Sequence, residues 1–188
     1  MRIGLLYAKK WYPQSDWVVT MDGDGQHSPK DILKLVKSVE QKRLLILIGN
    51  RVINENPMNI QPHRRHLANV ATTKFVNKIF KLNISDLQSG FRIYHQKITP
   101  YLIKGTKSTK FQFETEILLE AWAMNITIGE ESIIKIYYPS LPSRINGVED
   151  TLKWVWLVFL RIVFFPKKFS QRRNNKNVIW EIWKEISN

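Results

Sequence analysis

Apolar residues follow two different spacings along the chain, and these spacings predict strands followed by helices. Continuous apolar runs over Trp17–Met21 and Leu44–Ile48 are typical of buried strands. Between them, Ser28-Pro29-Lys30-Asp31 predicts a helix start, with Ser28 as N-cap and Pro29 at the first helical position. Further helices are predicted over Arg2–Lys10, Arg64–Lys81 and Phe111–Met124, and further strands over Gly90–Tyr94 and Ile133–Tyr138. This alternation indicates an α/β fold with a parallel or mixed sheet.

Charge and composition narrow the possible partners. The 188 residues carry 29 Lys and Arg against 16 Asp and Glu, which gives a net charge of +13. That excess favours an anionic partner: phosphates, a lipid surface or nucleic acid. The chain has no cysteine, so disulfides and thiolate metal sites are excluded. Its length predicts one domain with a possible appendage.

The segment from Asp22 to His27, with the sequence Asp-Gly-Asp-Gly-Gln-His, comes directly after the first predicted strand. In open α/β sheets, ligands bind at the carboxyl ends of strands. Asp22 and Asp24 point the same way along an extended chain, with their Cα atoms roughly 6.6 Å apart. Two such carboxylates can share one divalent cation whose other positions are filled by substrate phosphates. The segment therefore predicts a metal-dependent site for a phosphate-bearing substrate.

The segment from Asp22 to His27 also has a structural interpretation and two other functional ones. Asp-Gly pairs are common turn formers, so the segment can also be purely structural. An EF-hand loop counted from Asp22 fails, because the sixth position is His27 rather than Gly and the twelfth is Leu33 rather than Glu. A haloacid-dehalogenase-like phosphatase would use Asp22 as nucleophile. Such phosphatases have Thr or Val where this chain has Gln26. They also need a later pair of acidic residues at a strand end, and no good candidate for that pair is found.

Two later segments hold further candidate residues. Around Gly90, the chain places Asp86, Ser89 and Arg92, which suit a general base and groups that contact an oxyanion or phosphate. The structural alternative is a turn that only leads into a strand. Phe111-Gln112-Phe113-Glu114-Thr115-Glu116 opens a helix, where the dipole alone would favour its acids. In the functional interpretation, one glutamate, which we take to be Glu114, orients the acceptor or a basic side chain.

In this order, the three segments resemble the family 2 glycosyltransferases, and within them the dolichol-phosphate mannosyltransferase and polyprenyl-phosphate glycosyltransferase branch. The likeness runs from about Arg2 to Tyr138. The combination of Asp-Gly-Asp-Gly-Gln-His with a downstream Gln-Ser-Gly-Phe-Arg is specific, whereas either half alone would be weak. The residues that carry the likeness are Val18–Pro29, Gly49-Asn50-Arg51, Asp86–Arg92 with Tyr94, and Phe111–Glu116.

The resemblance implies a GT-A fold, a Rossmann-like α/β sandwich with a mainly parallel sheet. It implies transfer of a sugar from a nucleotide-sugar donor to a polyprenyl phosphate or glycan acceptor. Asp22 and Asp24, assisted by Gln26, would bind Mg²⁺ or Mn²⁺ and the nucleotide diphosphate. Asp86 is the candidate base. The residues implied to contact phosphate or cofactor also include Arg51, Arg64, Arg65, Ser89 and Arg92.

One departure from the family concerns the N-terminal part of the domain. Relatives begin with a Pro-x-Tyr-Asn-Glu-type strand and a second strand that ends in Asp-Asp-Gly-Ser, which together hold the nucleoside. This chain opens at Arg2-Ile3-Gly4-Leu5, which resembles the helix that follows them. We therefore expect an N-terminally truncated domain that lacks two β-α units, roughly 60 residues at about 30 each. We also expect this truncation to impair transferase activity.

The C-terminal region carries a separate signal. Aromatic and aliphatic residues crowd Leu152–Phe165, but Lys153 and Arg161 make this stretch too short and too charged to span a bilayer comfortably. Cations follow it, as in helices that lie on anionic lipid at the cytoplasmic face. We thus predict a partial GT-A domain over residues 1–148 and a basic, amphipathic, membrane-associated helical region over 149–188.

A basic α/β protein that binds nucleic acid or a membrane surface without catalysis is the alternative from another class. Its net charge permits that function. No helix-turn-helix, RRM or zinc pattern is present, and the acids gather in the predicted cleft, so we expect no nucleic-acid partner.

Overall fold

The computed structural model describes residues 1–51, 63–108, 112–134, 154–160, 163 and 180–184, without the side chains of residues 63–68. The chain divides into two compact units, which are described separately. The sheet unit comprises Gln14–Gln96 and Ile128–Pro142, and the helical unit comprises Met1–Pro13, Lys97–Thr127 and Ser143–Asn188. The predicted boundary between residues 148 and 149 lies outside the described residues and stays a prediction.

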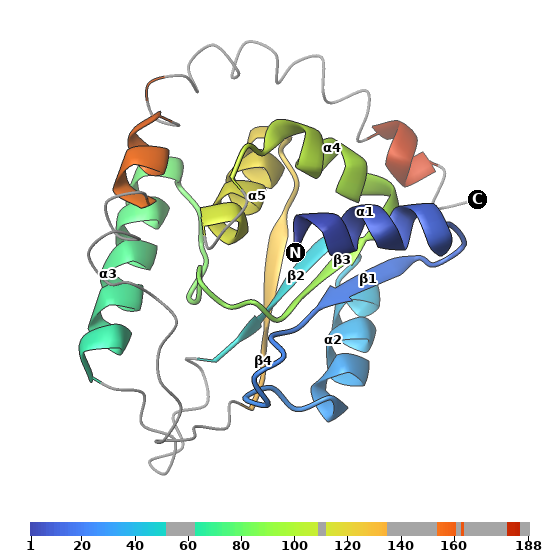
Figure 1. The fold of residues 1–188 in the computed structure, drawn as a ribbon, viewed down its shortest axis with the longest axis horizontal. Helices are drawn as coiled ribbons and strands as arrows, with labels where there is room; N and C mark the ends of the chain where they lie inside the picture. The colour runs from blue at the N-terminus through green and yellow to red at the C-terminus, as the bar shows by residue number, and fades with distance from the viewer. Residues whose placement is uncertain (52–62, 109–111, 135–153, 161–162, 164–179, 185–188) are drawn as a thin grey trace. The chain divides into compact units, whose positions relative to one another are not determined.

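A four-stranded mixed sheet forms the centre of the sheet unit (Figure 1). Its spatial order is β1 (Trp17–Thr20), β3 (Arg92–His95), β2 (Ile46–Asn50) and β4 (Ile128–Ser132). β2 and β4 pair in parallel, whereas β3 pairs antiparallel with both β1 and β2. Three strands therefore run in one direction, with β3 reversed between them. The predicted α/β class is confirmed.

Helix α2 (Lys30–Gln41) supplies the packing partner of this sheet. Leu35 and Val39 of α2 are buried in one cluster with Leu47 and Ile93 of the central strands. Helix α2 begins at Lys30 with Pro29, not the predicted Ser28, as its N-cap and with no side-chain capping hydrogen bond, although Lys30 N donates to Ser28 Oγ at 3.3 Å. The second helix of this unit, α3, runs from His63 to Phe80.

The helical unit contains α1 (Arg2–Trp11), α4 (Thr99–Gly105) and α5 (Gln112–Ala123), with α4 in contact with both of the others. A short 3₁₀ turn, η1 (Gln96–Ile98), precedes α4. Residues 154–160 and 180–184 are also helical, and Trp154 Nε1 donates to Thr115 Oγ1 at 3.1 Å. Within the described residues, no helix combines the length and apolarity needed to cross a bilayer.

The last strand is the main difference from the sequence expectation. We predicted a strand over Ile133–Tyr138, but the strand β4 lies just before it, at Ile128–Ser132. Residues 135–138 lie outside the described part of the chain. The sequence Ile-Gly-Glu-Glu-Ser has no apolar run because β4 lies at the sheet edge, where its glutamates serve as hydrogen-bond acceptors.

Candidate active site

Two of the three candidate motifs, those of Asp22 and Asp86, meet at the edge of the sheet that the strand ends form, because of strand direction. β1 and β2 end there, and β3 begins there, so Thr20 and Ile48 both pair with Arg92. The segment that follows β1 therefore adjoins the turn that precedes β3. Thr20 Oγ1 donates to Gly90 O at 3.0 Å, which ties the two segments directly.

The turn from Asp22 to His27, here called the Asp22 turn, is the exposed part of this edge. The Asp22 side chain is 46% exposed, and Asp24 is also exposed. Asp24 Oδ1 accepts a hydrogen bond from Gln26 N at 3.0 Å, and Gly25 has φ 76°, a left-handed conformation that suits glycine. The buried His27 contacts Asp22 through Nε2, 3.2 Å from Oδ2. Carboxylate oxygens are thus presented outward from a fixed turn.

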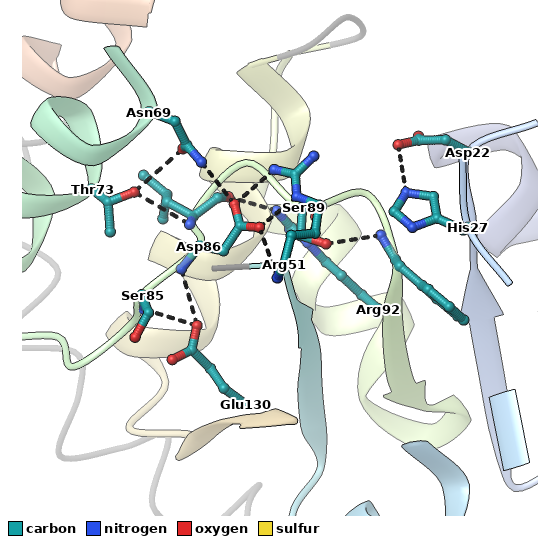
Figure 2. Close-up of polar contacts among 12 residues, drawn as sticks. Asp22, His27, Arg51, Asn69, Thr73, Ser85, Asp86, Ser89, Arg92 and Glu130 are labelled. Carbon is teal, nitrogen blue, oxygen red and sulfur yellow. Dashed lines mark hydrogen bonds and ion pairs between the residues drawn. The ribbon is translucent and has the colours of Figure 1, made fainter. Parts of the chain in front are cut away.

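The turn from Ser85 to Arg92, here called the Asp86 turn, has the opposite character (Figure 2). The Asp86 side chain is fully buried. It accepts hydrogen bonds from Arg51 N at 3.3 Å and from Arg51 Nε, and Arg51 Nη2 donates at 2.7 Å. Asn69 Nδ2 of α3 donates at 3.0 Å. Asp86 therefore fixes the Arg51 guanidinium in a two-point ion pair.

Opposing effects set the pKa of Asp86. Burial of the carboxyl acts to raise its pKa, because the charged form loses hydration. The hydrogen bonds and positive charge of Arg51, with the hydrogen bond from Asn69, outweigh burial and hold the pKa below the ordinary value of 3.8. Asp86 is consequently ionised at neutral pH but is a weak proton acceptor.

Residues beyond the predicted set hold the Asp86 turn in place. Glu130 of β4 accepts hydrogen bonds from Ser85 N at 2.8 Å and from Asp86 N at 3.1 Å. Thr73 of α3 accepts one from Leu87 N at 3.4 Å. Sequence reasoning missed Glu130, Asn69 and His27, although His27 stood inside a motif already singled out. Asn69 and Glu130 are distant in sequence, so their contacts with Asp86 carried no local signal.

The structure places Ser89 and Arg92, two predicted phosphate-contacting residues, inside the fold. Both are fully buried. Arg92 Nε donates to Ser89 O at 2.7 Å and Nη2 donates to Leu87 O at 2.8 Å, while Ser89 Oγ accepts from Phe91 N. Both side chains are therefore engaged in forming the Asp86 turn, and their contact with a ligand stays a prediction.

The other predicted residues are placed as follows. Glu114 lies half-buried in the first turn of α5, in the helical unit. Its neighbour Glu116 is buried and accepts hydrogen bonds from Lys107 N and Ser108 N at 2.9 and 2.7 Å. Arg64 and Arg65 lie in the first turn of α3, and their side chains are outside the described residues.

The donor set of the Asp22 turn can be compared with what a divalent cation needs. Among the described residues, no three His, Cys, Asp or Glu side chains gather to hold a metal by themselves. Mg²⁺, however, is commonly held by one or two carboxylates together with substrate phosphates. Asp22 and Asp24 supply exposed, hard oxygen donors of that kind, with Gln26 between them and the helix. The residues present fit a cation shared with a diphosphate.

Comparison with known proteins shows what the residues at this edge are similar to. Residues 12–102, which include both turns, match glycosyl transferase family 2. Over these residues the chain is similar to that family. The resemblance inferred from the motifs is confirmed by this match.

Three relatives show how much of the chain is similar to known proteins. An uncharacterized protein of Methanocaldococcus jannaschii is 26% identical over 147 residues, 78% of this chain and 60% of that protein. The UDP-N-acetylglucosamine–dolichyl-phosphate N-acetylglucosaminyltransferase of Methanococcus voltae is 26% identical over 123 residues, 65% and 49% of the two chains. A low-salt glycan biosynthesis hexosyltransferase of Haloferax volcanii is 27% identical over 127 residues, 67% and 30%. The chain thus spans 30% to 60% of the length of these relatives.

Proposed function

We propose that this chain carries the acceptor side and the metal site of a GT-A glycosyltransferase that transfers a sugar from a nucleotide-sugar donor to a polyprenyl phosphate. Similarity to the family supports glycosyl transfer. The Methanococcus voltae relative, a dolichyl-phosphate N-acetylglucosaminyltransferase, supports a lipid phosphate acceptor. The net charge of +13 suits the phosphates of donor and acceptor.

The state of Asp86 is the observation that favours a phosphate acceptor over a sugar hydroxyl. A hydroxyl acceptor needs a base whose pKa lies near the working pH. Asp86 has a lowered pKa and already accepts hydrogen bonds from Arg51 and Asn69. A polyprenyl phosphate is ionised at neutral pH, so its oxygen can attack the anomeric carbon with no proton to remove. A weak base is no disadvantage for that reaction.

Each group then has a separate task. Asp22 and Asp24, with Gln26, bind the divalent cation, Mg²⁺ or Mn²⁺. When bound, such a cation compensates the charge of the departing nucleoside diphosphate. Arg51, oriented by Asp86, together with Arg64 and Arg65, binds the acceptor phosphate. The remaining predicted residues have supporting roles: Ser89 and Arg92 shape the Asp86 turn, and Glu114 orients the acceptor.

A peripheral position at the cytoplasmic face of a membrane suits a lipid acceptor. In the helical unit, Trp156 and Phe159 stack with their ring centroids 5.7 Å apart, and both are more than half exposed. Trp180 is also exposed. Tryptophans beside cations favour the interface between water and lipid, and these residues support the proposed membrane contact.

An acceptor competition assay tests this function. The purified chain receives Mn²⁺, UDP- and GDP-sugars, and either polyprenyl phosphate in detergent or a free glycan. We expect slow transfer to the phosphate, with little dependence of its rate on pH near neutrality. Asp86→Asn should raise the KM for polyprenyl phosphate more than it lowers kcat, because Arg51 loses its orienting partner. Transfer only to the hydroxyl acceptor, at a rate that rises with pH, would contradict the proposal.

A further inference from the structure

His27 is a buried imidazole placed against an exposed carboxylate. Its side chain is 1% exposed, whereas that of Asp22 is 46% exposed. Nε2 lies 3.2 Å from Asp22 Oδ2, and Figure 2 shows the ring directed toward that carboxylate. The imidazole makes a T-shaped contact with the Phe91 ring, with the centroids 5.2 Å apart and the planes at 65°. The ring is therefore in contact with Phe91 while Nε2 faces Asp22.

The Asp22 carboxylate also lies very close to the backbone of Gly90. A Cβ atom at position 90 would lie 2.4 Å from Asp22 Oδ1 and 2.8 Å from Oδ2. Only a residue without a side chain leaves room for the carboxylate in its present position. Gly90 and Phe91 are consecutive residues of the Asp86 turn, so this turn both makes room for Asp22 and supports His27.

The hydrogen bonding of His27 indicates which nitrogen carries the proton. Within the described residues, Nδ1 is buried and has no hydrogen-bond partner. A neutral imidazole with its proton on Nε2 leaves only a lone pair at Nδ1, whereas a proton at Nδ1 would be a buried donor without an acceptor. The geometry is consequently that of Nε2–H donating to Asp22 Oδ2.

We propose that His27 is a positioning residue that holds the Asp22 carboxylate in the orientation in which it binds the divalent cation of the donor diphosphate. This inference rests on the proposed function, because it concerns the same metal site. Hydrogen bonds to metal-ligating groups typically change metal affinity 10- to 100-fold. The buried ring and Gly90 together preorganise one ligand of an otherwise exposed pair.

A matched pair of variants tests the hydrogen-bond donor of His27 separately from the packing of its ring. His27→Phe keeps a planar ring against Phe91 but removes the N–H, whereas His27→Gln keeps an N–H near the position of Nε2. Mn²⁺ is titrated into the full 188-residue chain by calorimetry with UDP present and, separately, with GDP. We expect His27→Phe to weaken Mn²⁺ binding about 10- to 100-fold and His27→Gln to restore most of it. If His27→Phe does not fold, His27→Met replaces it, because Met fills apolar space without a donor.

Each outcome decides the question. Unchanged Mn²⁺ affinity in His27→Phe, or equally weak binding in folded His27→Phe and His27→Gln, overturns the positioning role while the metal site stands. A nitrogen coupling from ¹⁵N-labelled histidine in the Mn²⁺ resonance spectrum that disappears in Mn²⁺-bound His27→Gln also overturns it, because His27 would then be a direct ligand. Absence of Mn²⁺ binding by the wild-type chain with either nucleotide rejects this inference together with the proposed metal site.

Discussion

The Asp22 turn and the Asp86 turn present the same chemical group in opposite states. Both carry carboxylates at one edge of the sheet, and Gly90 brings the two turns into contact. Asp86 is fully buried and accepts hydrogen bonds from Arg51 and Asn69, whereas Asp22 is about half exposed and is approached by His27. The first carboxylate orients a protein cation, and we propose that the second binds an external one. Burial rather than residue type therefore separates their roles.

The largest expected effect comes from Asp86→Ala. Removing this carboxylate leaves Arg51, whose side chain is only 13% exposed, without its charge partner. Breaking a buried pair from one side typically costs about 3–5 kcal/mol. We expect the free energy of unfolding in urea to fall by about that amount. Asp24→Ala, in the exposed turn, is the matched control and should change it by less than about 0.5 kcal/mol. Equal effects of the two variants would contradict the contrast between the turns.

Acid titration should show the same contrast. The pKa of Asp86 is lowered in the folded chain, so its stabilisation is fully present above its ordinary value of 3.8. That stabilisation is lost as pH falls from there through the lower folded pKa. Unfolding free energies measured from neutral pH to below pH 4 should fall more steeply for the wild-type chain than for Asp86→Asn. Parallel curves for the two proteins would show that Asp86 carries no such linkage.

The two turns also differ in how far the sequence predicted them. Asp22 and Asp24 were identifiable because a local motif follows an apolar strand, and strand direction explains their place at the sheet edge. The burial of Arg92 was not predictable, since a guanidinium in a turn looks the same in sequence whether it meets phosphate or backbone carbonyls. Glu130 was missed for a related reason: it lies on β4, whose polar sequence lacks the apolar pattern of a buried strand.

A smaller effect is expected where the turns touch. Gly90→Ala would push the flexible Asp22 carboxylate out of its present position, because the new Cβ would otherwise lie 2.4 Å from Oδ1. We expect Mn²⁺ affinity, measured with UDP or GDP present, to fall about 10-fold, as for loss of a group supporting a metal ligand. The free energy of unfolding should change by less than about 1 kcal/mol, since an exposed side chain can rotate away. Mn²⁺ affinity equal to wild type would show that the contact between the turns has no part in metal binding.

A modest effect on stability should come from Glu131, a partly exposed carboxylate of β4 that contacts α2. Hydrogen bonds from Ser38 and then Lys42 lower its pKa from 4.5 to about 2, against the opposing effect of burial. Its contribution to stability is present above pH 4.5 and is lost as pH falls toward about 2. Glu131→Gln should lower the free energy of unfolding at neutral pH by about 1 kcal/mol, reduced by solvent screening. A loss as large as that of Asp86→Ala would mean that burial does not determine how much each carboxylate contributes to stability.

The most direct test of the metal site is the thermal unfolding midpoint of the chain with Mn²⁺ and UDP or GDP. A ligand that binds only the folded state raises this midpoint. We expect Mn²⁺ and one nucleoside diphosphate together to raise the wild-type midpoint. Neither ligand should raise it alone, and Asp24→Asn should abolish the rise. A rise retained in Asp24→Asn would remove the metal assignment of the Asp22 turn, and no rise in the wild-type chain would contradict a metal-dependent donor site in these residues.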